Sequence, residues 1–498
     1  MATRRAVIDI GSNSVRLVIY EGPPRTPIAV FNEKALCGLG DRVPETGALR
    51  QAAMDEALRV LRRFAAVLED DSIQTLHVFA TAASREAPNG PAFLAEVRAT
   101  GFTPTLLTGE EEARLAALGI LSGAPEVLTE PGGALAGDMG GGSLELSRLL
   151  ADAPEGIAQR VSLPLGGLRL STVYRGDMAG AKRAAREALS GLDWLGATDG
   201  QPAPRTFFVV GGAWRAIGRL AIAHDDHPIR ILDHYALSAD RMVELCRLIE
   251  RQSPETLAAT PGVQSRRAPT LPYAAMILRK VVERSNAQRV AISSCGVREG
   301  SLFADLSADD RRTDPLIALC GHYAERLSPG SMARRRAIYG FLGPGFAGET
   351  HREARLRRAA TKLANVAGLF HPDARANEAG VTVLNMPFIS LTHEERVMLA
   401  AALYQRHTSS EADFPEHLHT RLLTADEADW ARRVGLGLRF ATDLDPVGTN
   451  ALPKASLQVD GGALRLRLAE GDAAYLGDAP RRRFDRFAGA LGLAPVVD

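Results

Sequence analysis

The sequence predicts an α/β protein whose N-terminal part consists of two similar lobes. A turn of one design occurs twice, as Asp9-Ile-Gly-Ser-Asn-Ser14 and as Asp138-Met-Gly-Gly-Gly-Ser143, and a leucine follows at the same offset in each copy, Leu17 and Leu146. Each copy comes after an apolar run, which predicts a strand entering a tight turn with backbone amides free to meet anionic oxygens. Two such turns facing each other would bind a phosphate chain.

The first lobe is expected over residues 1–125. Residues 6–20 predict a strand, the glycine-serine turn and a second strand, and residues 49–68 carry apolar side chains along one helical face. Residues 75–80 have strand character and lead towards Arg85. Gly123-Ala-Pro125 would end this lobe.

Three further domains are expected. Residues 126–304 repeat the opening of strand, turn and strand and form the second lobe. Residues 305–437 are rich in alanine and leucine at helical spacing, which predicts a helical domain. In residues 438–498, the segment 457–468 places a Gly-Gly turn between alternating apolar positions, which predicts a hairpin in a small α+β domain.

Composition excludes little. The chain has 498 residues, long enough for several domains, and 59 basic side chains balance 59 acidic ones, so net charge gives no argument for nucleic acid or a membrane. No charged segment followed by a long apolar core opens the chain and no run of about 20 apolar residues occurs, so we expect a cytoplasmic protein with no membrane partner. The four cysteines are widely spaced and predict reduced, mostly buried thiols.

The two turns supply the residue types that hold a phosphoryl group. Their glycines and short polar side chains leave no bulky Cβ in the way of an incoming phosphate. A lone Gly-Gly-Gly turn is more often a simple strand connection, but the matching second copy favours binding. The expected phosphate-binding residues of the turns are Ser12, Asn13, Ser14, Gly140, Gly141, Gly142 and Ser143.

Acidic residues beside the turns predict a metal site. Asp138 ends an apolar strand, where a carboxylate is costly unless it meets a cation or several donors, so we assign it to Mg²⁺. Glu145 lies just beyond the turn and could face the same ion, or be a solvated strand residue. Asp9 is the counterpart of Asp138 in the first lobe and could contact the metal or order a water molecule.

Six segments in order resemble those of the exopolyphosphatase and guanosine pentaphosphate phosphatase family. This family belongs to the acetate kinase, heat-shock ATPase and actin superfamily, whose lobes have the ribonuclease H-like fold. The segments are the two turns, Thr81-Ala-Ala-Ser-Arg-Glu-Ala87, Gly109-Glu-Glu-Glu-Ala-Arg-Leu115, Val210-Gly-Gly-Ala-Trp-Arg-Ala216 and Ser294-Cys-Gly-Val-Arg-Glu-Gly300. Glycine-rich turns are common, so the order of all six carries the resemblance.

The resemblance implies a general base and a phosphate-binding arginine. Glu112 occupies the place of the family's catalytic glutamate, while Thr108 and Glu111 have the spacing of a capping box that starts the helix. Arg85 matches the family's phosphate-binding arginine, although a surface ion pair would also explain it. The resemblance also supports Mg²⁺ at Asp138 and Glu145, and it implies that Mn²⁺ can substitute, that a monovalent cation such as K⁺ can activate and that the protein is a homodimer.

The C-terminal half resembles that of the long members of the family, whose helical domain is similar to the HD phosphohydrolase fold. The nearest match to the HD metal motif, His371-Pro-Asp373, is interrupted by Pro372, so we expect no metal chemistry there, and substrate binding or dimer packing instead. Residues 311–370 hold eleven Arg and Lys against four Asp and Glu, an excess of seven. We interpret this stretch as a track for polyphosphate, with a solvated helix face as the alternative.

The expected activity is release of orthophosphate from the end of inorganic polyphosphate. Guanosine pentaphosphate 5'-phosphohydrolase, alone or as a second activity, is the main alternative because both reactions break a phosphoanhydride. A superfamily kinase or ATPase stays open, although Trp214 is expected to crowd a nucleotide base, and so does a non-catalytic polyphosphate-binding regulator. The sparse aromatic residues among the arginines do not favour nucleic acid.

Overall fold

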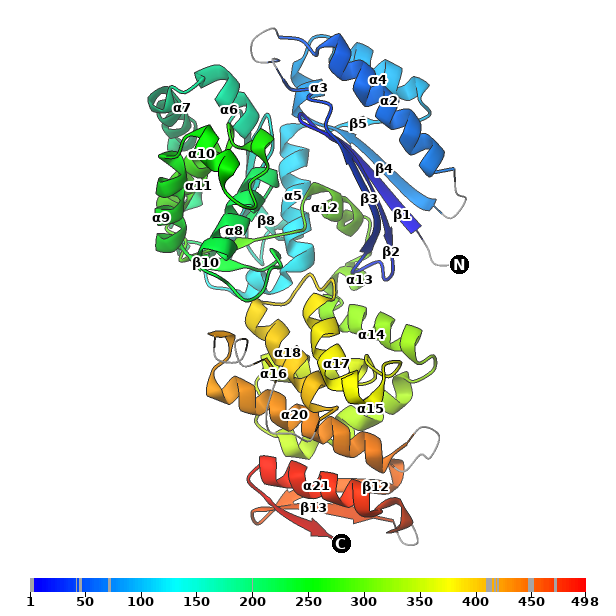
Figure 1. Cartoon of the computed structure of the whole chain (residues 1–498). Coiled ribbons are helices and arrows are strands. Elements are labelled where there is room, and N and C mark those ends of the chain that lie inside the picture. The colour runs from blue at the N-terminus through cyan, green and yellow to red at the C-terminus, as the bar shows by residue number, and fades with distance from the viewer. Residues whose placement is uncertain are drawn as a thin grey trace. The chain divides into compact units, whose positions relative to one another are not determined.

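The structure is a computed structural model that describes residues 4–41, 43, 47–69, 73–198, 200–408, 414, 415, 418, 421–446, 452–469 and 473–498. Its internal contacts divide the chain into two compact units, Met1–Thr313 and Asp314–Asp498 (Figure 1). No helix in these ranges is long and apolar enough to cross a membrane. The four cysteines are all buried and free, as expected.

Two mixed β-sheets form the framework of the first unit. The strands of the first sheet are β1 Arg4–Ile10, β2 Val15–Glu21, β3 Ile28–Ala35, β4 Ile73–Ala80 and β5 Thr105–Leu106. Those of the second are β6 Ala134–Met139, β7 Leu144–Leu149, β8 Ile157–Leu163, β9 Thr206–Val210, β10 Ala236–Ser238 and β11 Arg289–Ile292. We call the first sheet with its helices lobe I and the second lobe II.

The two sheets share a five-stranded part of the same topology, to which lobe II adds the antiparallel edge strand β10. In lobe I the order is β3-β2-β1-β4-β5, with β1, β2 and β3 antiparallel and β4 and β5 parallel to β1. In lobe II the order is β10-β11-β9-β6-β7-β8, where β6, β7 and β8 repeat the antiparallel part and β9 and β11 the parallel part. Each repeated turn joins the first two strands of its sheet. The expected two-lobed α/β fold is confirmed.

Two helices lie between the inner faces of the sheets. They are α5 (Gly109–Gly123) and α12 (Val297–Ala304), which pack on each other and share one apolar core with both sheets (Figure 1). The approach is so close that a Cβ on Gly300 of α12 would collide with the Leu115 carbonyl oxygen of α5. Because α5 follows lobe I in the sequence and α12 ends lobe II, this pair couples the lobes.

The remaining helices of the unit cover the outer faces of the sheets. Lobe I carries α2 (Gln51–Val67), α3 (Ala82–Glu86) and α4 (Gly90–Ala99). Lobe II carries α6 (Gly167–Tyr174), α7 (Met178–Ser190), α8 (Gly212–His224), α9 (Ala239–Glu250), α10 (Pro254–Ala259) and α11 (Leu271–Ser285). A short helix, α13 (Ala308–Arg312), follows α12. The helix expected over residues 49–68 is α2, and its apolar stripe is buried as predicted.

The second unit is mostly helical. It contains α14 (Pro315–Leu327), α15 (Met332–Phe341), α16 (His351–Leu363), α17 (Arg375–Asn385), α18 (His393–Gln405) and α20 (Ala425–Leu444). A small sheet of β12 (Ala455–Asp460), β13 (Ala463–Leu468) and β14 (Ala494–Val497) follows, with α21 (Asp478–Ala490) packed against it. The β12–β13 hairpin was predicted, and Gly461 and Gly462 both have the positive φ that its two-residue turn requires.

Two observed positions bear on the expected domain boundaries. The units divide between Thr313 and Asp314, nine residues after the expected end of lobe II at residue 304. Helix α20 runs without a break across the boundary expected between residues 437 and 438. Apolar periodicity continues through that point, and only the later turn residues separate the helix from the hairpin.

Candidate active site between the two lobes

The two repeated turns have matching geometry. In lobe I the Gly11 amide donates to the Ser14 carbonyl at 3.0 Å, and in lobe II the Gly140 amide donates to the Ser143 carbonyl at 3.0 Å. The repeat seen in the sequence is therefore a repeat of backbone structure. It places Asp9 and Asp138 at corresponding strand ends.

The carbonyl groups of both turns are held by the protein behind them. Gly40 and Gly38 donate to the carbonyls of Ser12 and Asn13 at 2.6 and 3.2 Å. In lobe II, the amides of the segment that begins α6 donate to the carbonyls of Gly140, Gly141 and Gly142 at 3.0–3.2 Å.

Between these bonds the turns leave several amides for a ligand. Within the described part of the chain, the amides of Ser12, Asn13, Gly141 and Gly142 have no hydrogen-bond acceptor. Successive unpaired amides in a turn form a concavity that suits an anion.

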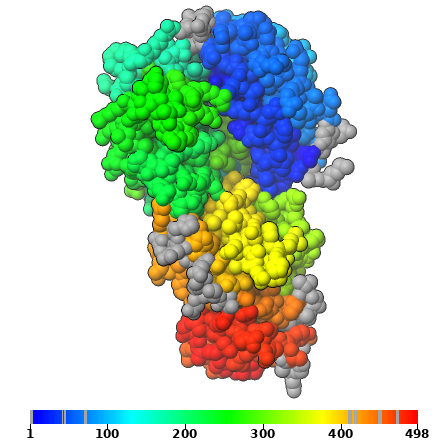
Figure 2. Space-filling view, in the orientation of Figure 1, coloured from blue at the N-terminus to red at the C-terminus, as the bar shows by residue number. Residues whose placement is uncertain are grey.

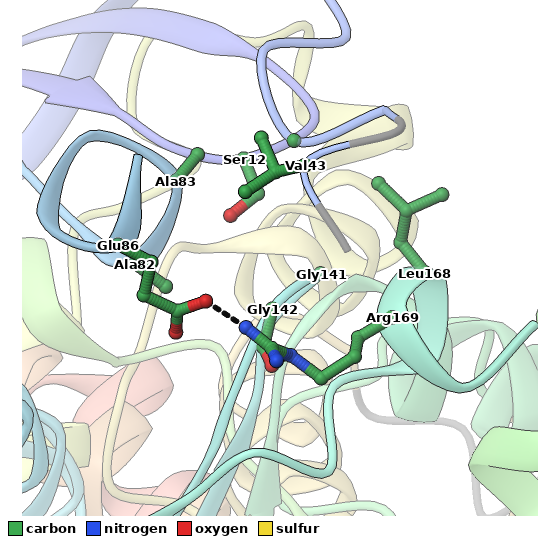
Figure 3. A pocket seen from close by; sticks show the side chains of 10 residues that line it. Ser12, Val43, Ala82, Ala83, Glu86, Gly141, Gly142, Leu168 and Arg169 are labelled. Carbon is green, nitrogen blue, oxygen red and sulfur yellow. Dashed lines mark hydrogen bonds and ion pairs between the residues drawn. The ribbon is translucent and has the colours of Figure 1, made fainter. Parts of the chain in front are cut away.

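The turns face each other at close range. A Cβ on Gly142 would lie 2.9 Å from the Ala82 Cβ and 3.3 Å from the Ser12 hydroxyl, so a side chain at this position would not fit. Figure 3 shows Ser12 above Gly141 and Gly142, with Arg169 of α6 reaching an ion pair with Glu86 of α3. Arg169 also donates to the Gly142 carbonyl at 3.0 Å. This ion pair joins the lobes beside the turns.

Strand register extends each turn into a row of side chains across the inner face of its sheet. In lobe I, Asp9 on β1 lies opposite Arg16 on β2, which lies opposite Lys34 on β3. In lobe II, Asp138 on β6 lies opposite Glu145 on β7, which lies opposite Ser162 on β8. The two rows therefore correspond position by position. Asp9 is equivalent to Asp138, Arg16 to Glu145, and Lys34 to Ser162.

Glu112 enters this space from the first turn of α5. Thr108 caps the helix by accepting from the Glu111 amide at 3.1 Å, as predicted, but the Glu111 carboxylate turns to Arg114 and leaves the capping box half formed. The Glu112 carboxylate is buried and accepts from Arg85 at 3.3 Å, while Arg85 also donates to a backbone carbonyl at 2.7 Å. Arg85 thus orients the carboxylate.

The acidic groups of the site raise one another's pKa. Burial raises the pKa of Glu112 to about 7, with Asp138 and Asp9 adding to the rise and Arg85 opposing it. Burial likewise raises the pKa of Asp138 to about 6 and that of Glu145 well above its usual range, and neighbouring carboxylates contribute to both shifts. Glu145 is 2 % exposed. The contacts that lower its pKa are hydrogen bonds from hydroxyl groups, including that of Ser162 at 2.7 Å.

Arg298 is a site residue that the sequence predicts only as a structural partner of its neighbour Glu299. It is buried on α12, its Nη1 has no hydrogen-bond partner in the described part of the chain, and its charge lowers the pKa of both Asp9 and Asp138. The charges of Arg298 and Glu299 attract each other, but within the described part of the chain no direct ion pair joins them. Glu299 instead accepts from Tyr20 of β2 at 2.6 Å and from the Gly296 amide at 2.9 Å.

The donors around Asp138 and Glu145 fit Mg²⁺. Two carboxylates directly opposite on neighbouring strands repel, and a divalent cation would relieve that repulsion. No three His, Cys, Asp or Glu side chains of the described residues converge closely enough to hold a metal by themselves. Mg²⁺ commonly takes only one or two carboxylates and completes its shell with water and phosphate oxygens.

Comparison with known proteins places the chain in a family. The Ppx/GppA phosphatase family matches residues 5–309, which include both lobes and every site residue described above, and the exopolyphosphatase C-terminal family matches residues 336–494. The chain belongs to the Ppx/GppA phosphatase family. As a member of this family it is a hydrolase, which agrees with paired phosphate turns beside a buried carboxylate.

Curated members of the Ppx/GppA family are similar over much of the chain. Exopolyphosphatase 1 of Mycobacterium tuberculosis is 28% identical over 351 residues, covering 67% of this chain and 97% of the relative. Guanosine-5'-triphosphate,3'-diphosphate pyrophosphatase of Aeromonas salmonicida is 24% identical over 497 residues, covering 95% of this chain and 94% of the relative.

Solved structures share the fold of the two lobes. A Ppx/GppA family member from Aquifex aeolicus has a TM-score of 0.51 at 24% identity and covers 61% of this chain and 98% of its own. An exopolyphosphatase from Cytophaga hutchinsonii has a TM-score of 0.54 at 23% identity and covers 61% and 97%. At these identities the comparison supports the fold.

The structure changes the interpretation of Trp214 and shows where the histidines of the interrupted HD motif lie. Trp214 does not crowd the site, because it is completely buried in the core of lobe II and donates to the Ala274 carbonyl at 3.0 Å. The charge of the neighbouring residue, Arg215, lowers the pKa of Asp138. His371 and Asp373 are both exposed and 3.6 Å apart, while His393 is buried at the start of α18.

Part of the basic stretch of residues 311–370 is neutralised by carboxylates of the second unit. Where its basic residues are densest, most of the arginines form ion pairs or donate to backbone carbonyls. The ion pairs are Arg334 with Asp445, Arg352 with Glu395 and Glu427, Arg355 with Asp314, and Arg357 with Glu349, while Arg335 donates to the backbone carbonyl of Lys362. Asp445, Glu395 and Glu427 lie outside the stretch, so a local charge count does not include them. A track for polyphosphate would have fewer free cations than the sequence suggested.

Proposed function

We propose that this Ppx/GppA family member is a Mg²⁺-dependent exopolyphosphatase that releases orthophosphate from the end of inorganic polyphosphate. One observation carries the proposal: Glu112 lies buried among Asp138, Glu145 and Asp9, with a pKa of about 7, beside two turns with unpaired amides. A carboxylate with that pKa is suited to accept a proton from water near neutral pH.

The chain's own residues would perform the reaction as follows. Amides of the two turns and Arg85 hold the terminal phosphoryl group, and Arg85 keeps Glu112 oriented. Glu112 takes a proton from a water molecule as the water oxygen bonds to the terminal phosphorus. The bond from that phosphorus to the bridging oxygen breaks, the shortened chain leaves with the bridging oxygen, and orthophosphate is formed. Mg²⁺ at Asp138 and Glu145 would neutralise charge on the phosphate oxygens.

Two similarities support polyphosphate as the substrate. Relatives named exopolyphosphatase align with both lobes, and the family matched by residues 336–494 is the exopolyphosphatase C-terminal family. Guanosine pentaphosphate is the second candidate, because the relative named guanosine-5'-triphosphate,3'-diphosphate pyrophosphatase aligns with 95% of the chain. We also propose a cytoplasmic homodimer, which sedimentation and cell fractionation would test.

The test measures orthophosphate release from long-chain polyphosphate and from guanosine pentaphosphate side by side. Native protein and Glu112→Gln are assayed with Mg²⁺, then with Mn²⁺ in its place and with added K⁺. Loss of the base should lower kcat by roughly 10²–10⁴-fold. The matched control is Glu110→Gln, at an exposed position two residues earlier on the same helix. Strong preference for guanosine pentaphosphate would replace the polyphosphate proposal, and a fully active Glu112→Gln would remove the assigned base.

A further inference from the structure

The two lobes are joined by contacts of two different kinds. At the helix pair α5 and α12, backbone packs on backbone, since a Cβ on Gly119 would lie 2.3 Å from the Gly296 carbonyl oxygen. Beside the turns, Glu86 at the end of α3 instead forms an ion pair with Arg169 of α6 (Figure 3). One junction therefore depends on close packing and the other on two charged side chains.

These junctions differ in how easily they separate. Parting α5 from α12 would expose an apolar core that both sheets share, which is unfavourable. The ion pair is partly exposed, with 22% of the Arg169 side chain and 34% of the Glu86 side chain accessible, and ion pairs of this exposure contribute little to stability. The lobes should therefore part at the turns and pivot about the helix pair.

With the ion pair formed, the two turns are shut. A Cβ on Gly141 would lie 3.2 Å from the Ser12 Cβ, so turn meets turn directly. The cavity that Glu86 and Arg169 line at this point measures about 10 Å³, which is space for about one water molecule. A phosphoryl group carries three oxygens around its phosphorus and is larger, so the turns must move apart to take one between them.

Both partners of the ion pair are tied to groups that would meet the substrate. Glu86 follows Arg85 on the five-residue helix α3, and Arg85 donates to the Glu112 carboxylate at 3.3 Å. Arg169 donates from Nε to the Gly142 carbonyl at 3.0 Å. Forming the pair therefore fixes α3 against the turn of lobe II.

We propose that Glu86 and Arg169 are positioning residues, whose ion pair opens to admit the terminal phosphoryl group and re-forms to seat Arg85 and the lobe II turn on it. The inference rests on the proposed function and adds the residues that control entry and alignment. Neither side chain takes part in making or breaking a bond. Their loss should lower kcat more than it changes KM, because alignment stabilises the transition state.

Steady-state release of orthophosphate from polyphosphate tests the alignment in Glu86→Gln, Arg169→Gln and the double variant. Each single change should lower kcat by about tenfold, with KM and Tm nearly unchanged. The double variant should be no slower than Arg169→Gln, because both changes remove one contact. The control is Glu283→Gln, which breaks ion pairs inside lobe II and should keep the native kcat. A native kcat in Glu86→Gln, or losses that multiply in the double variant, would overturn the proposal.

A reversible cross-link tests the opening without turnover. Glu86→Cys and Arg169→Cys are combined, and a short bis-maleimide that contains a reducible disulfide bridges the two positions. The four native cysteines are buried, and Glu86→Cys alone, treated in the same way, is the control. Tripolyphosphate is titrated calorimetrically into the bridged and the reduced protein. Bridging should weaken binding by about tenfold or more, and reduction should restore it, because only the open form admits phosphate.

The binding result separates this inference from the proposed function. Equal affinity of the bridged and the reduced protein for tripolyphosphate would show that phosphate enters without opening, which would overturn the proposal. If native protein released no phosphate from polyphosphate or guanosine pentaphosphate while bridging still blocked binding reversibly, the proposed activity would fail and the opening of this ion pair would stand.

Discussion

The two lobes place the same turn on the same strands, yet their side-chain rows have opposite chemistry. Lobe I continues from Asp9 to Arg16 and Lys34, so its acid is followed by two cations. Lobe II continues from Asp138 to Glu145 and Ser162, so its acid is followed by another acid and a hydroxyl group. One backbone design thus supports a cationic surface in one lobe and an anionic one in the other.

This difference assigns separate tasks to the two copies. The charges of Arg298, Arg16 and Lys34 oppose the effect of burial on the pKa of Asp9, so side chains balance its charge in part, although its pKa stays raised. Apart from burial, the groups that act most strongly on the pKa of Glu145 are acids and hydroxyl groups. No cation is among them, so its charge is not balanced. Under the proposed function, the lobe II row is therefore the one that would hold Mg²⁺, while the turns of both lobes would meet phosphate.

The largest expected effect comes from neutralising one aspartate of each lobe. Asp138→Asn should lower kcat/KM by roughly 10²–10³-fold because it removes a carboxylate that we assign to Mg²⁺. Asp9→Asn, the matched change in lobe I, should lower it by about tenfold or less. Steady-state assays over a Mg²⁺ series compare them, and only Asp138→Asn should shift the Mg²⁺ requirement. Equal losses in the two variants would break the distinction between the lobes.

Stability against pH gives the next largest effect. The folded-state pKa values of Asp138 and Glu112 are raised to about 6 and about 7, above their unfolded values near 4. Their contribution to stability is therefore fully present below pH 4 and is lost as pH rises through 6 to 7. Mg²⁺ should restore about 2.7 kcal/mol at pH 8 when it exceeds its Kd a hundredfold, which is a rise in Tm of roughly 4–8 °C.

Thermal melts with and without Mg²⁺ at pH 8 and pH 5 measure this dependence. The shift should disappear at pH 5, where protons compete for the same carboxylates, and in Asp138→Asn at either pH, whereas Asp9→Asn should keep it. A shift of equal size at both pH values would place the metal away from these carboxylates.

The local sequence was sufficient to predict the repeat, the helix of Glu112 and the placement of Arg85. Turn chemistry and apolar spacing act over a few residues, and the two turns meet because both sheets repeat one topology. Glu112, Asp138 and Glu145 come together because α5 packs on lobe II, which the family resemblance implied and no local pattern contained.

Long-range partners were beyond the reach of local patterns. Arg298 stood in a quoted motif and was interpreted only as a partner of Glu299, but its charge also acts on Asp9 and Asp138. The arginines of residues 311–370 counted as a basic surface until carboxylates 43 to 111 positions away were found to neutralise Arg352 and Arg334. In both cases charge depends on which elements pack together.

The smallest expected effect tests the hydroxyl at the end of the lobe II row. Ser162 donates to Glu145 at 2.7 Å and so favours the ionised carboxylate that Mg²⁺ needs. Ser162→Ala should therefore weaken Mg²⁺ activation by roughly three- to tenfold and leave kcat at saturating Mg²⁺ unchanged, because one hydrogen bond contributes about 1 kcal/mol. Ser171→Ala, which removes a local hydroxyl contact on α6, is the control. A fall in kcat that saturating Mg²⁺ did not restore would show that Ser162 shapes the reacting geometry, and lobe II would then serve more than metal binding.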